Sequence, residues 1–339
     1  MIEKDYPIDF VVTWVDGNDP VWQAEKAKYS PNKNADNRNV RFRDWDNMQY
    51  WFRAVEKFAP WVNKIHFVTY GHLPKWLNIN NPKLNIAKHS DFIPQKYLPT
   101  FSSQPIELNL HRINGLAERF VYFNDDMFLL RPVKRELFFA GKDCLPTDFA
   151  ITSTISTTTK EDMMPFIKLN CVTILNGHFD KKEQMKKHFS KWVNLAYGWN
   201  ALRNLIFYGQ HRFKGFANNH LAFSFLKSEY EDIWKKEYES LDDTSSHKFR
   251  SKLDLDNWLI RYWQLTRGNF YPIGRHVKGK VYEIYNGVEQ NQELFKIIEN
   301  QAMPMICIND NDNVDFESMK ERIKQAFDRI LPEKSSFEK

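Results

Sequence analysis

The sequence predicts an α/β fold, namely a Rossmann-like, mostly parallel sheet with flanking helices and a helical C-terminal portion. Two observations support this prediction. Short runs of β-branched and aromatic residues alternate with segments in which apolar residues recur at helical spacing. Polar turn residues also close the first run, residues 8–15, and the last, residues 120–123. In a parallel sheet both turns would lie at the carboxyl ends of the strands, where α/β proteins bind their ligands.

The strands and helices of this sheet follow one another in the first part of the chain. Residues 8–15 predict a buried strand that ends at the turn "DGNDP". Residues 45–62 have apolar side chains at helical spacing and predict a helix that ends near Pro60. Two more strands are expected, at residues 64–71 and within residues 83–94. A helix capped by the serine pair of "SSQPIELNLHRI" then leads into the last strand.

The second half of the chain predicts mostly helices. Residues 180–195 and 316–334 have the pattern of basic amphipathic helices, and residues 200–265 are expected to be mainly helical. The sequence contains neither an internal repeat nor a long linker. We therefore expect an α/β core in residues 1–150 and a helical portion in residues 151–339 that completes the active site, both within one integrated domain.

Composition and charge exclude several classes of protein. The chain has 339 residues, of which 42% are hydrophobic and 27% charged, and its net charge of +5 is too small for a nucleic-acid-binding protein. Its 3 cysteines lie far apart, so they predict neither a disulfide framework nor a zinc site and suit a cytoplasmic setting. The N-terminus lacks the layout of a signal peptide, and no run approaches the roughly 20 apolar residues that span a bilayer. Membrane contact would therefore be peripheral, at the inner face of the plasma membrane through the basic amphipathic segments, and packing of these segments onto the domain is the alternative.

Three consecutive polar residues, Asn124, Asp125 and Asp126, follow the last strand of the predicted sheet. Two adjacent carboxylates repel each other, and their burial without a partner is costly. A divalent cation offsets that cost, and Mg²⁺ or Mn²⁺ prefers carboxylate ligands. The motif indicates a metal site, with a solvated turn and an N-cap aspartate as the alternative.

Two further motifs could join this site. Asp16 and Gly17 lie in the turn after the first strand, where they could bind a ribose hydroxyl or form an ordinary turn. Arg41 and Arg43, in "RFRD", could bind a phosphate or a sugar acid through forked hydrogen bonds, or lie in a charged loop.

His220 and Arg250 lie before segments with helical periodicity. A histidine can accept a proton near neutral pH, and an arginine suits the charge of a phosphoryl transition state, although each taken singly is more often structural. The sequence has no Gly-rich phosphate loop and no nucleophile elbow. These absences disfavour a P-loop kinase, a dehydrogenase and an α/β-hydrolase.

Taken in order, these motifs resemble the conserved blocks of the Stealth family. The first block is matched by "IDFVVTWVDGNDPVW", and the long second block by "RFRDWDNMQYWFRAVEKFAPWVNKIHFVTYGHLPKWLN" through "LPTFSSQPIELNLHRINGLAERFVYFNDDMFL". The third block is matched by "NNHLAFSFLKSEYEDIW" to "FRSKLDLDNWLIRYWQLTRG", and the fourth by "MICINDND". The resemblance covers nearly the whole chain, and its second block is highly specific.

The resemblance implies a sugar-1-phosphate transferase of the bacterial type, related to the animal GlcNAc-1-phosphotransferase. Such an enzyme transfers a hexose-1-phosphate, with GlcNAc-1-phosphate as the default, from a UDP-sugar to a hydroxyl of a glycan or lipid-linked glycan acceptor. A phosphodiester forms and UMP leaves, in the synthesis of capsular or cell-wall polysaccharide. Residues 1–150 would then bind the nucleotide sugar.

The resemblance also assigns roles to the residues that match the family's motifs. His220 would be the general base, Arg250 would bind the transferring phosphoryl group, and Asp126 would share in catalysis. The metal ion, Mg²⁺ or Mn²⁺, would be held by Asp125, Asp126 and Asp310. The residues that would bind the nucleotide sugar are Trp14, Asp16, Gly17, Arg41, Arg43 and Asn124.

The sequence departs from the family's pattern in one place. A proline often follows the histidine of the third block by a few residues, whereas residues 221–224 read "LAFS". Two other functions stay open: a conventional metal-dependent glycosyltransferase, which would release UDP instead of UMP, and a non-catalytic carbohydrate-binding subunit. The sugar, the acceptor, the linkage position and the oligomeric state are left open as well.

Overall fold

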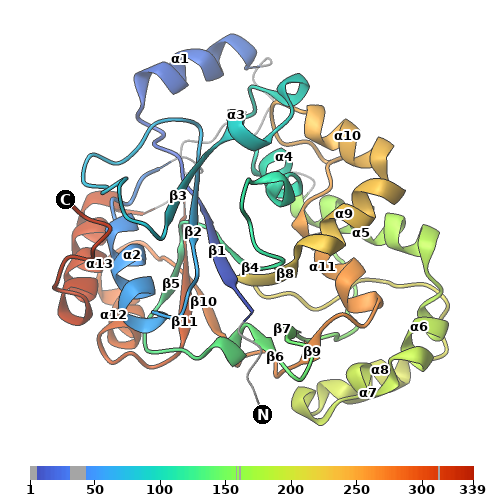
Figure 1. The fold of residues 1–339 in the computed structure, drawn as a ribbon. Coiled ribbons are helices and arrows are strands. Elements are labelled where there is room, and N and C mark those ends of the chain that lie inside the picture. Colours follow the sequence, from blue (N-terminus) through green and yellow to red (C-terminus); the bar gives the residue numbers. More distant parts are fainter. Residues whose placement is uncertain (1–5, 31–42, 158, 160–161, 312–313) are drawn as a thin grey trace.

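The computed structural model describes residues 6–30, 43–157, 159, 162–311 and 314–339, and the statements below concern these residues. Its central element is a five-stranded sheet with the order β3-β2-β1-β4-β8 (Figure 1). β1 pairs in parallel with β2 and β4, β2 pairs in parallel with β3, and β8 closes the sheet antiparallel to β4. The strands are β1 (Ile8–Thr13), β2 (Ile65–Thr69), β3 (Leu84–Lys88), β4 (Arg119–Phe123) and β8 (Phe223–Leu226). This mostly parallel sheet with flanking helices confirms the predicted fold class.

Two three-stranded sheets lie beside the central one. The first consists of β10 (Gly279–Glu283), β11 (Met305–Asn309) and β5 (Met127–Leu129), and the second of β6 (Phe139–Ala140), β7 (Leu145–Asp148) and β9 (Tyr271–Pro272). β5 directly follows Asp126, and the backbone N–H of Ile308 in β11 donates to the carbonyl oxygen of Asp126 at 2.8 Å. A strand near the C-terminus therefore supports the turn that carries the two carboxylates. A domain division at residue 150 stays a prediction, and strands from both sides of it pair in shared sheets.

Helices cover both faces of the central sheet, with α2, α12 and α13 on one side and α5, α9 and α11 on the other (Figure 1). The helices before residue 150 are α1 (Pro20–Tyr29), α2 (Met48–Phe58), α3 (His89–Phe92) and α4 (Ser103–Leu108). Those after it are α5 (Met164–His178), α6 (Lys181–Lys187), α7 (Phe189–Trp192), α8 (Asn200–Ile206), α9 (Lys227–Lys236), α10 (Tyr238–Ser246), α11 (Asn257–Thr266), α12 (Gln292–Glu299) and α13 (Phe316–Ile330). No helix in the described ranges is both long and apolar enough to cross a bilayer.

Two hydrophobic cores occupy the opposite faces of the central sheet. Side chains alternate along β1, so Phe10 and Val12 belong to the core that includes α2, α12 and α13, while Val11 belongs to the core that includes α5, α9 and α11. Because both faces are covered, the strand is apolar almost without a break, as parallel sheets require.

Asp9 is the polar exception in β1, and its side chain is fully buried. Its carboxylate accepts hydrogen bonds from Asn63 Nδ2 at 2.7 Å and from the Ala117 N–H at 2.8 Å, and it lies 3.0 Å from His66 Nε2. Burial alone would raise the pKa of Asp9, but hydrogen bonds from His66, Asn63 and Ala117 lower it below its ordinary value of 3.8. A buried carboxylate thus fastens the start of β1 to both neighbouring segments.

Some predicted elements are confirmed and others are wrong. The helix expected in residues 45–62 is α2, and the one expected in residues 316–334 is α13. The helix expected after the serine pair is only six residues long, and the Ser102 hydroxyl donates to Gln104 Oε1 instead of capping it. The helix expected over residues 180–195 is broken into α6 and α7 at His188, which has a non-helical backbone.

The mainly helical region expected over residues 200–265 also contains a strand. Residues 223–226 form β8, because the edge of β4 offers backbone partners and three of the four side chains, from Ser224 to Leu226, are buried there. The segment that follows His220 is therefore a strand that joins the central sheet.

Candidate active site

A cavity of about 910 Å³ opens at the carboxyl ends of β1 and β4. Because these strands are parallel neighbours, the turns that follow them lie side by side, as the sequence predicts. The predicted site residues that line the cavity are Trp14, Arg43, Asn124, Asp125, Asp126, His220, Arg250 and Asp310. The fold therefore brings together residues that lie more than 290 positions apart in the sequence.

Asp16 and Gly17 lie in the turn after β1, beside the cavity and not among the described residues that line it. Asp16 Oδ1 accepts the N–H of Asn18 at 2.9 Å, and the N–H of Asp16 donates to His72 Nε2 at 2.8 Å. These contacts fit an ordinary turn, and a part of Asp16 and Gly17 in nucleotide binding stays a prediction. The predicted site residue Arg41 lies outside the described residues.

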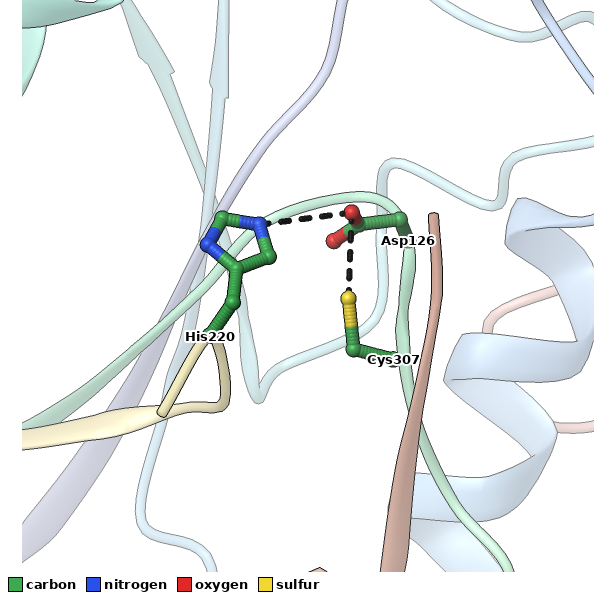
Figure 2. A group of neighbouring side chains, drawn as sticks. All are labelled: Asp126, His220 and Cys307. Atoms are coloured by element: carbon green, nitrogen blue, oxygen red, sulfur yellow. Dashed lines mark hydrogen bonds and ion pairs between the residues drawn. The ribbon is translucent and has the colours of Figure 1, made fainter. Parts of the chain in front are cut away.

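The Asp126 carboxylate is the centre of a small polar cluster (Figure 2). Its Oδ2 accepts a hydrogen bond from the Cys307 thiol at 3.2 Å and lies 3.5 Å from His220 Nε2. The amide Nδ2 of Asn124 lies 3.4 Å from the same ring nitrogen. The other carboxylate oxygen, Oδ1, is buried and has no hydrogen-bond partner among the described residues. One oxygen of Asp126 is thus held by protein groups while the other is left for a ligand.

Electrostatic interactions shift the pKa values of this cluster. Burial, together with the charges of Asp126 and Asp44, raises the pKa of Asp125 to about 7. Desolvation in the cavity lowers the pKa of His220, but the hydrogen bond and the charge of Asp126 outweigh it and raise the value above 6.5. Shifted carboxyl and imidazole groups that share one cavity are typical of active sites.

Asp125 and Asp126 have the donor chemistry that a divalent cation needs, and their part in binding one stays a prediction. The buried Asp126 Oδ1 has no partner among the described residues, and a positive charge nearby would favour the ionised form of Asp125, whose pKa is raised. Both offer the oxygen ligands that Mg²⁺ and Mn²⁺ prefer. Burial, together with the charge of Asp126, raises the pKa of Cys307 well above its ordinary value, which fits a protonated thiol that donates a hydrogen bond to Asp126 Oδ2.

Asp310, the third predicted metal ligand, forms a forked ion pair with Arg43. The distances are 3.1 Å from Nε to Oδ2 and 3.2 Å from Nη2 to Oδ1, and Trp45 Nε1 donates to Oδ2 at 3.2 Å. These contacts neutralise its charge and fix the segment after β11 against residues 43–45. A part of Asp310 in metal binding stays a prediction.

Arg250 lies on the loop before α11, in the same cavity wall as α4. Its Nη2 donates to Ser103 Oγ at 3.1 Å and its Nε donates to Gln104 Oε1 at 3.2 Å. Burial raises the pKa of Glu107, and the charge of Arg250 partly offsets this effect. The guanidinium is therefore oriented by the first turn of α4 and lies within electrostatic reach of an acidic group.

Sequence reasoning missed five charged residues of the cavity wall, namely Asp44, Glu107, Lys168, Asp256 and Glu283. Asp256 caps α11 by accepting the N–H of Trp258 at 3.0 Å, and burial raises its pKa to about 7. An aspartate directly before an apolar helical run is an N-cap signal, so Asp256 could have been found. Glu107 and Lys168 are single charges within helices, and nothing in their local sequence marks them.

Paired carboxylates, an imidazole and a guanidinium at the strand ends of an α/β sheet indicate an enzyme that transfers a charged group. Comparison with known protein families agrees with this class. The model for conserved region 1 of the Stealth protein matches residues 6–34, and the model for conserved region 2 matches residues 41–145.

Known proteins similar to the chain are bacterial phosphotransferases. A capsular polysaccharide phosphotransferase, WcwK of Streptococcus pneumoniae, is 42% identical over 337 residues that cover 98% of each chain. A receptor polysaccharide phosphotransferase, WefC of Streptococcus gordonii, is 41% identical and covers 100% of both. An exopolysaccharide phosphotransferase, cps2G of Lactiplantibacillus plantarum, is 39% identical over 98% of this chain and 97% of its own. The chain belongs to the Stealth family, and it is a phosphotransferase.

Proposed function

We propose that this enzyme transfers a hexose-1-phosphate from a UDP-sugar to a hydroxyl of a glycan or lipid-linked glycan acceptor, in capsular or cell-wall polysaccharide synthesis. GlcNAc-1-phosphate is the first candidate for the transferred group. The acceptor oxygen attacks the phosphorus that bears the sugar, the bond from that phosphorus to UMP breaks, and a phosphodiester forms. The names of the relatives, which are capsular, receptor and exopolysaccharide phosphotransferases, support this reaction class.

The observation that carries the proposal is the Asp126 carboxylate, whose buried Oδ1 has no partner among the described residues. It lies in the wall of a cavity that His220 and Arg250 also line, so the groups proposed to hold a metal ion, to accept a proton and to bind phosphate share one space. The cavity volume of about 910 Å³ lies toward the upper end of the range for small-molecule sites, which is roughly 300–1,000 Å³, and suits a donor as large as a nucleotide sugar.

The groups of the cavity can divide the work of this transfer. Asp125 and Asp126 would hold Mg²⁺ or Mn²⁺, which neutralises diphosphate charge when bound. His220 would take the acceptor's hydroxyl proton at Nε2, and the imidazolium that results would be stabilised by the Asp126 carboxylate 3.5 Å away. Arg250 would bind the oxygens of the transferring phosphoryl group, where negative charge is spread in the transition state.

The test is the identity of the nucleotide product. The purified enzyme is incubated with UDP-GlcNAc, Mg²⁺ and acceptor glycan, and the nucleotides are separated by anion-exchange chromatography. We expect UMP, and we expect Asp126→Asn to abolish its formation because the phosphoryl charge is no longer neutralised. Asp143→Asn, at an exposed carboxylate outside the cavity, is the matched control and should leave UMP formation unchanged.

Two outcomes would contradict the proposal. Release of UDP would show that the bond at the anomeric carbon breaks, as in a conventional glycosyltransferase. Full activity of Asp126→Asn would mean that the carboxylate has no catalytic part. A panel of other UDP-sugars, also assayed by UMP release, would identify the donor.

A further inference from the structure

Residues 180–214, here called the α6–α8 platform, lie at one edge of the molecule (Figure 1). The buried ammonium group of Lys181 donates to the carbonyl oxygen of Phe207 at 2.7 Å, and the ring centroids of Phe189 and Tyr208 are 6.0 Å apart. These contacts join the start of α6 and the start of α7 to the end of α8. The three short helices therefore pack as one unit.

The platform exposes an unusual amount of apolar surface. Leu195 is 97% exposed, Trp199 is 84% exposed and Ile206 is 76% exposed. The large apolar side chains that are exposed in this part of the chain are Phe189, Leu195, Trp199, Leu202, Leu205 and Ile206. Single exposed apolar residues need no explanation, whereas a group of them within 18 consecutive residues marks an interaction surface.

α8 buries a polar side chain and exposes apolar ones. Asn204 is fully buried, where its amide accepts a hydrogen bond from Thr152 N at 2.8 Å and donates to Ala150 O at 2.5 Å. Leu202 and Ile206 lie on the exposed part of the same helix. A surface helix of a globular protein normally has the reverse arrangement, so this one presents its apolar side chains to something other than water.

The platform is also strongly basic. Residues 180–214 contain eight lysines and arginines and two acidic residues, a net charge of +6, whereas the whole chain carries +5. The rest of the molecule is therefore close to neutral. Lys182, Lys186 and Lys187 of α6 are exposed.

We propose that the α6–α8 platform docks on the surface of an anionic lipid bilayer. Exposed tryptophan and leucine side chains partition into the headgroup region, and lysines bind acidic headgroups electrostatically. The charge decides between a bilayer and a second copy of the chain, because two platforms with a net charge of +6 each would repel. The proposal does not rest on the proposed reaction, since lipid binding needs no turnover.

The docking surface differs from the amphipathic segments that the sequence suggests. In α6 the apolar Met185 is buried, and in α7 the apolar Trp192 is buried. The apolar side of α13, from Met319 to Ile330, packs into the core next to α2 and α12. Met185, Trp192 and the apolar side of α13 thus pack on the domain, and the residues proposed to face lipid are mainly those that follow α7, from Leu195 to Ile206.

The experiment measures binding of the full-length protein to vesicles by flotation. Vesicles of phosphatidylcholine with phosphatidylglycerol are compared with vesicles of phosphatidylcholine alone, at low and high ionic strength. We expect binding to the anionic vesicles that weakens with salt. Trp199→Ser combined with Ile206→Ser should weaken it about tenfold, because apolar contacts with the headgroup region are lost.

Matched variants keep the result specific. Ile79→Ser removes an isoleucine that is 54% exposed between β2 and β3, far from the platform in the sequence, and should leave vesicle binding unchanged. Lys182→Glu combined with Lys186→Glu should weaken binding to anionic vesicles only. The circular dichroism spectrum of each variant should match that of the parent, because the substituted side chains are exposed and do not belong to the core.

Three results would overturn the proposal. One is that no vesicle composition binds the protein, and another is that Trp199→Ser with Ile206→Ser binds as strongly as the parent. The third is a dimer, detected by light scattering in the absence of lipid, that the same two substitutions convert to a monomer. That result would assign the surface to self-association.

Discussion

Replacement of Asp256 by asparagine should stabilise the protein above neutral pH. The Asp256 side chain is 2% exposed, and burial, followed by the charge of Glu107, raises its pKa to about 7 from an ordinary value of 3.8. Each pKa unit corresponds to about 1.4 kcal/mol, so the ionised carboxylate costs about 4 kcal/mol of folding free energy. Asparagine carries no charge and is as good an N-cap as aspartate, so the hydrogen bond from the Trp258 N–H is kept.

The direction of the pH dependence follows from the raised pKa. The folded state binds a proton at Asp256 more tightly than the unfolded state does, so the stabilisation that this proton contributes to the folded state is fully present below about pH 4. It is lost as the pH rises through the folded value of about 7. The parent and Asp256→Asn should therefore unfold at similar temperatures near pH 4 and diverge above it. At about pH 8.5 a difference of about 4 kcal/mol corresponds to about 6 °C in Tm for a chain of this size.

The assay is thermal unfolding followed by circular dichroism, without divalent ions, over a series of pH values. Asp243→Asn, at an exposed carboxylate of α10, serves as the control and should show no pH-dependent difference from the parent. A Tm difference for Asp256→Asn that is constant with pH would refute the reasoning. So would a variant that is less stable than the parent at high pH, since that would mean the charge is compensated in the fold.

Three other substitutions test contacts elsewhere. Asp9→Asn should lower the free energy of unfolding, measured with urea at neutral pH, by about 2 kcal/mol, because a buried charged acceptor is lost. Since the pKa of Asp9 is lowered in the folded state, this difference should shrink as the pH falls below 3.8. A difference that does not shrink would contradict the reasoning. Arg43→Lys should lower the free energy of unfolding by about 1 kcal/mol, because lysine cannot form both bonds to Asp310; an equal effect of Arg43→Lys in an Asp310→Asn background would argue against the pair. Cys307→Ala should weaken Mn²⁺ binding about fivefold in calorimetry, because the donor that orients the metal-site carboxylate is lost, whereas Cys307→Ser should retain it.

The sheet could be predicted because both of its faces are buried. Strands covered on both sides read as continuous apolar runs, and the turns after β1 and β4 are marked by Asp, Asn and Gly residues. The position of these turns at the carboxyl edge then placed Asn124 and Asp126 beside Trp14. Periodicity and topology rules therefore suffice for the half of the site that is built on parallel strands.

The other half of the site depends on contacts between distant segments, which local patterns do not record. The sequence predicts a helix where β8 lies, because Phe223 and Phe225 directly precede an amphipathic helical segment. The segment is a strand because it pairs with the open edge of β4. Cys307 had no signal at all, since its role arises from the pairing of β11 with β5 next to Asp126.

The two carboxylates whose pKa values rise to about 7, Asp125 and Asp256, both line the same cavity. Asp9 shows that this fold can bury a carboxylate with a lowered pKa when several donors surround it. The cavity carboxylates are not surrounded in this way, so the fold tolerates a cost of several kcal/mol there that it avoids in the sheet. Such a cost in folding free energy is typical of a site where the carboxylate charge serves to bind a ligand. If Asp256→Asn is more stable but transfers sugar phosphate more slowly, Asp256 is retained for the reaction and not for the fold.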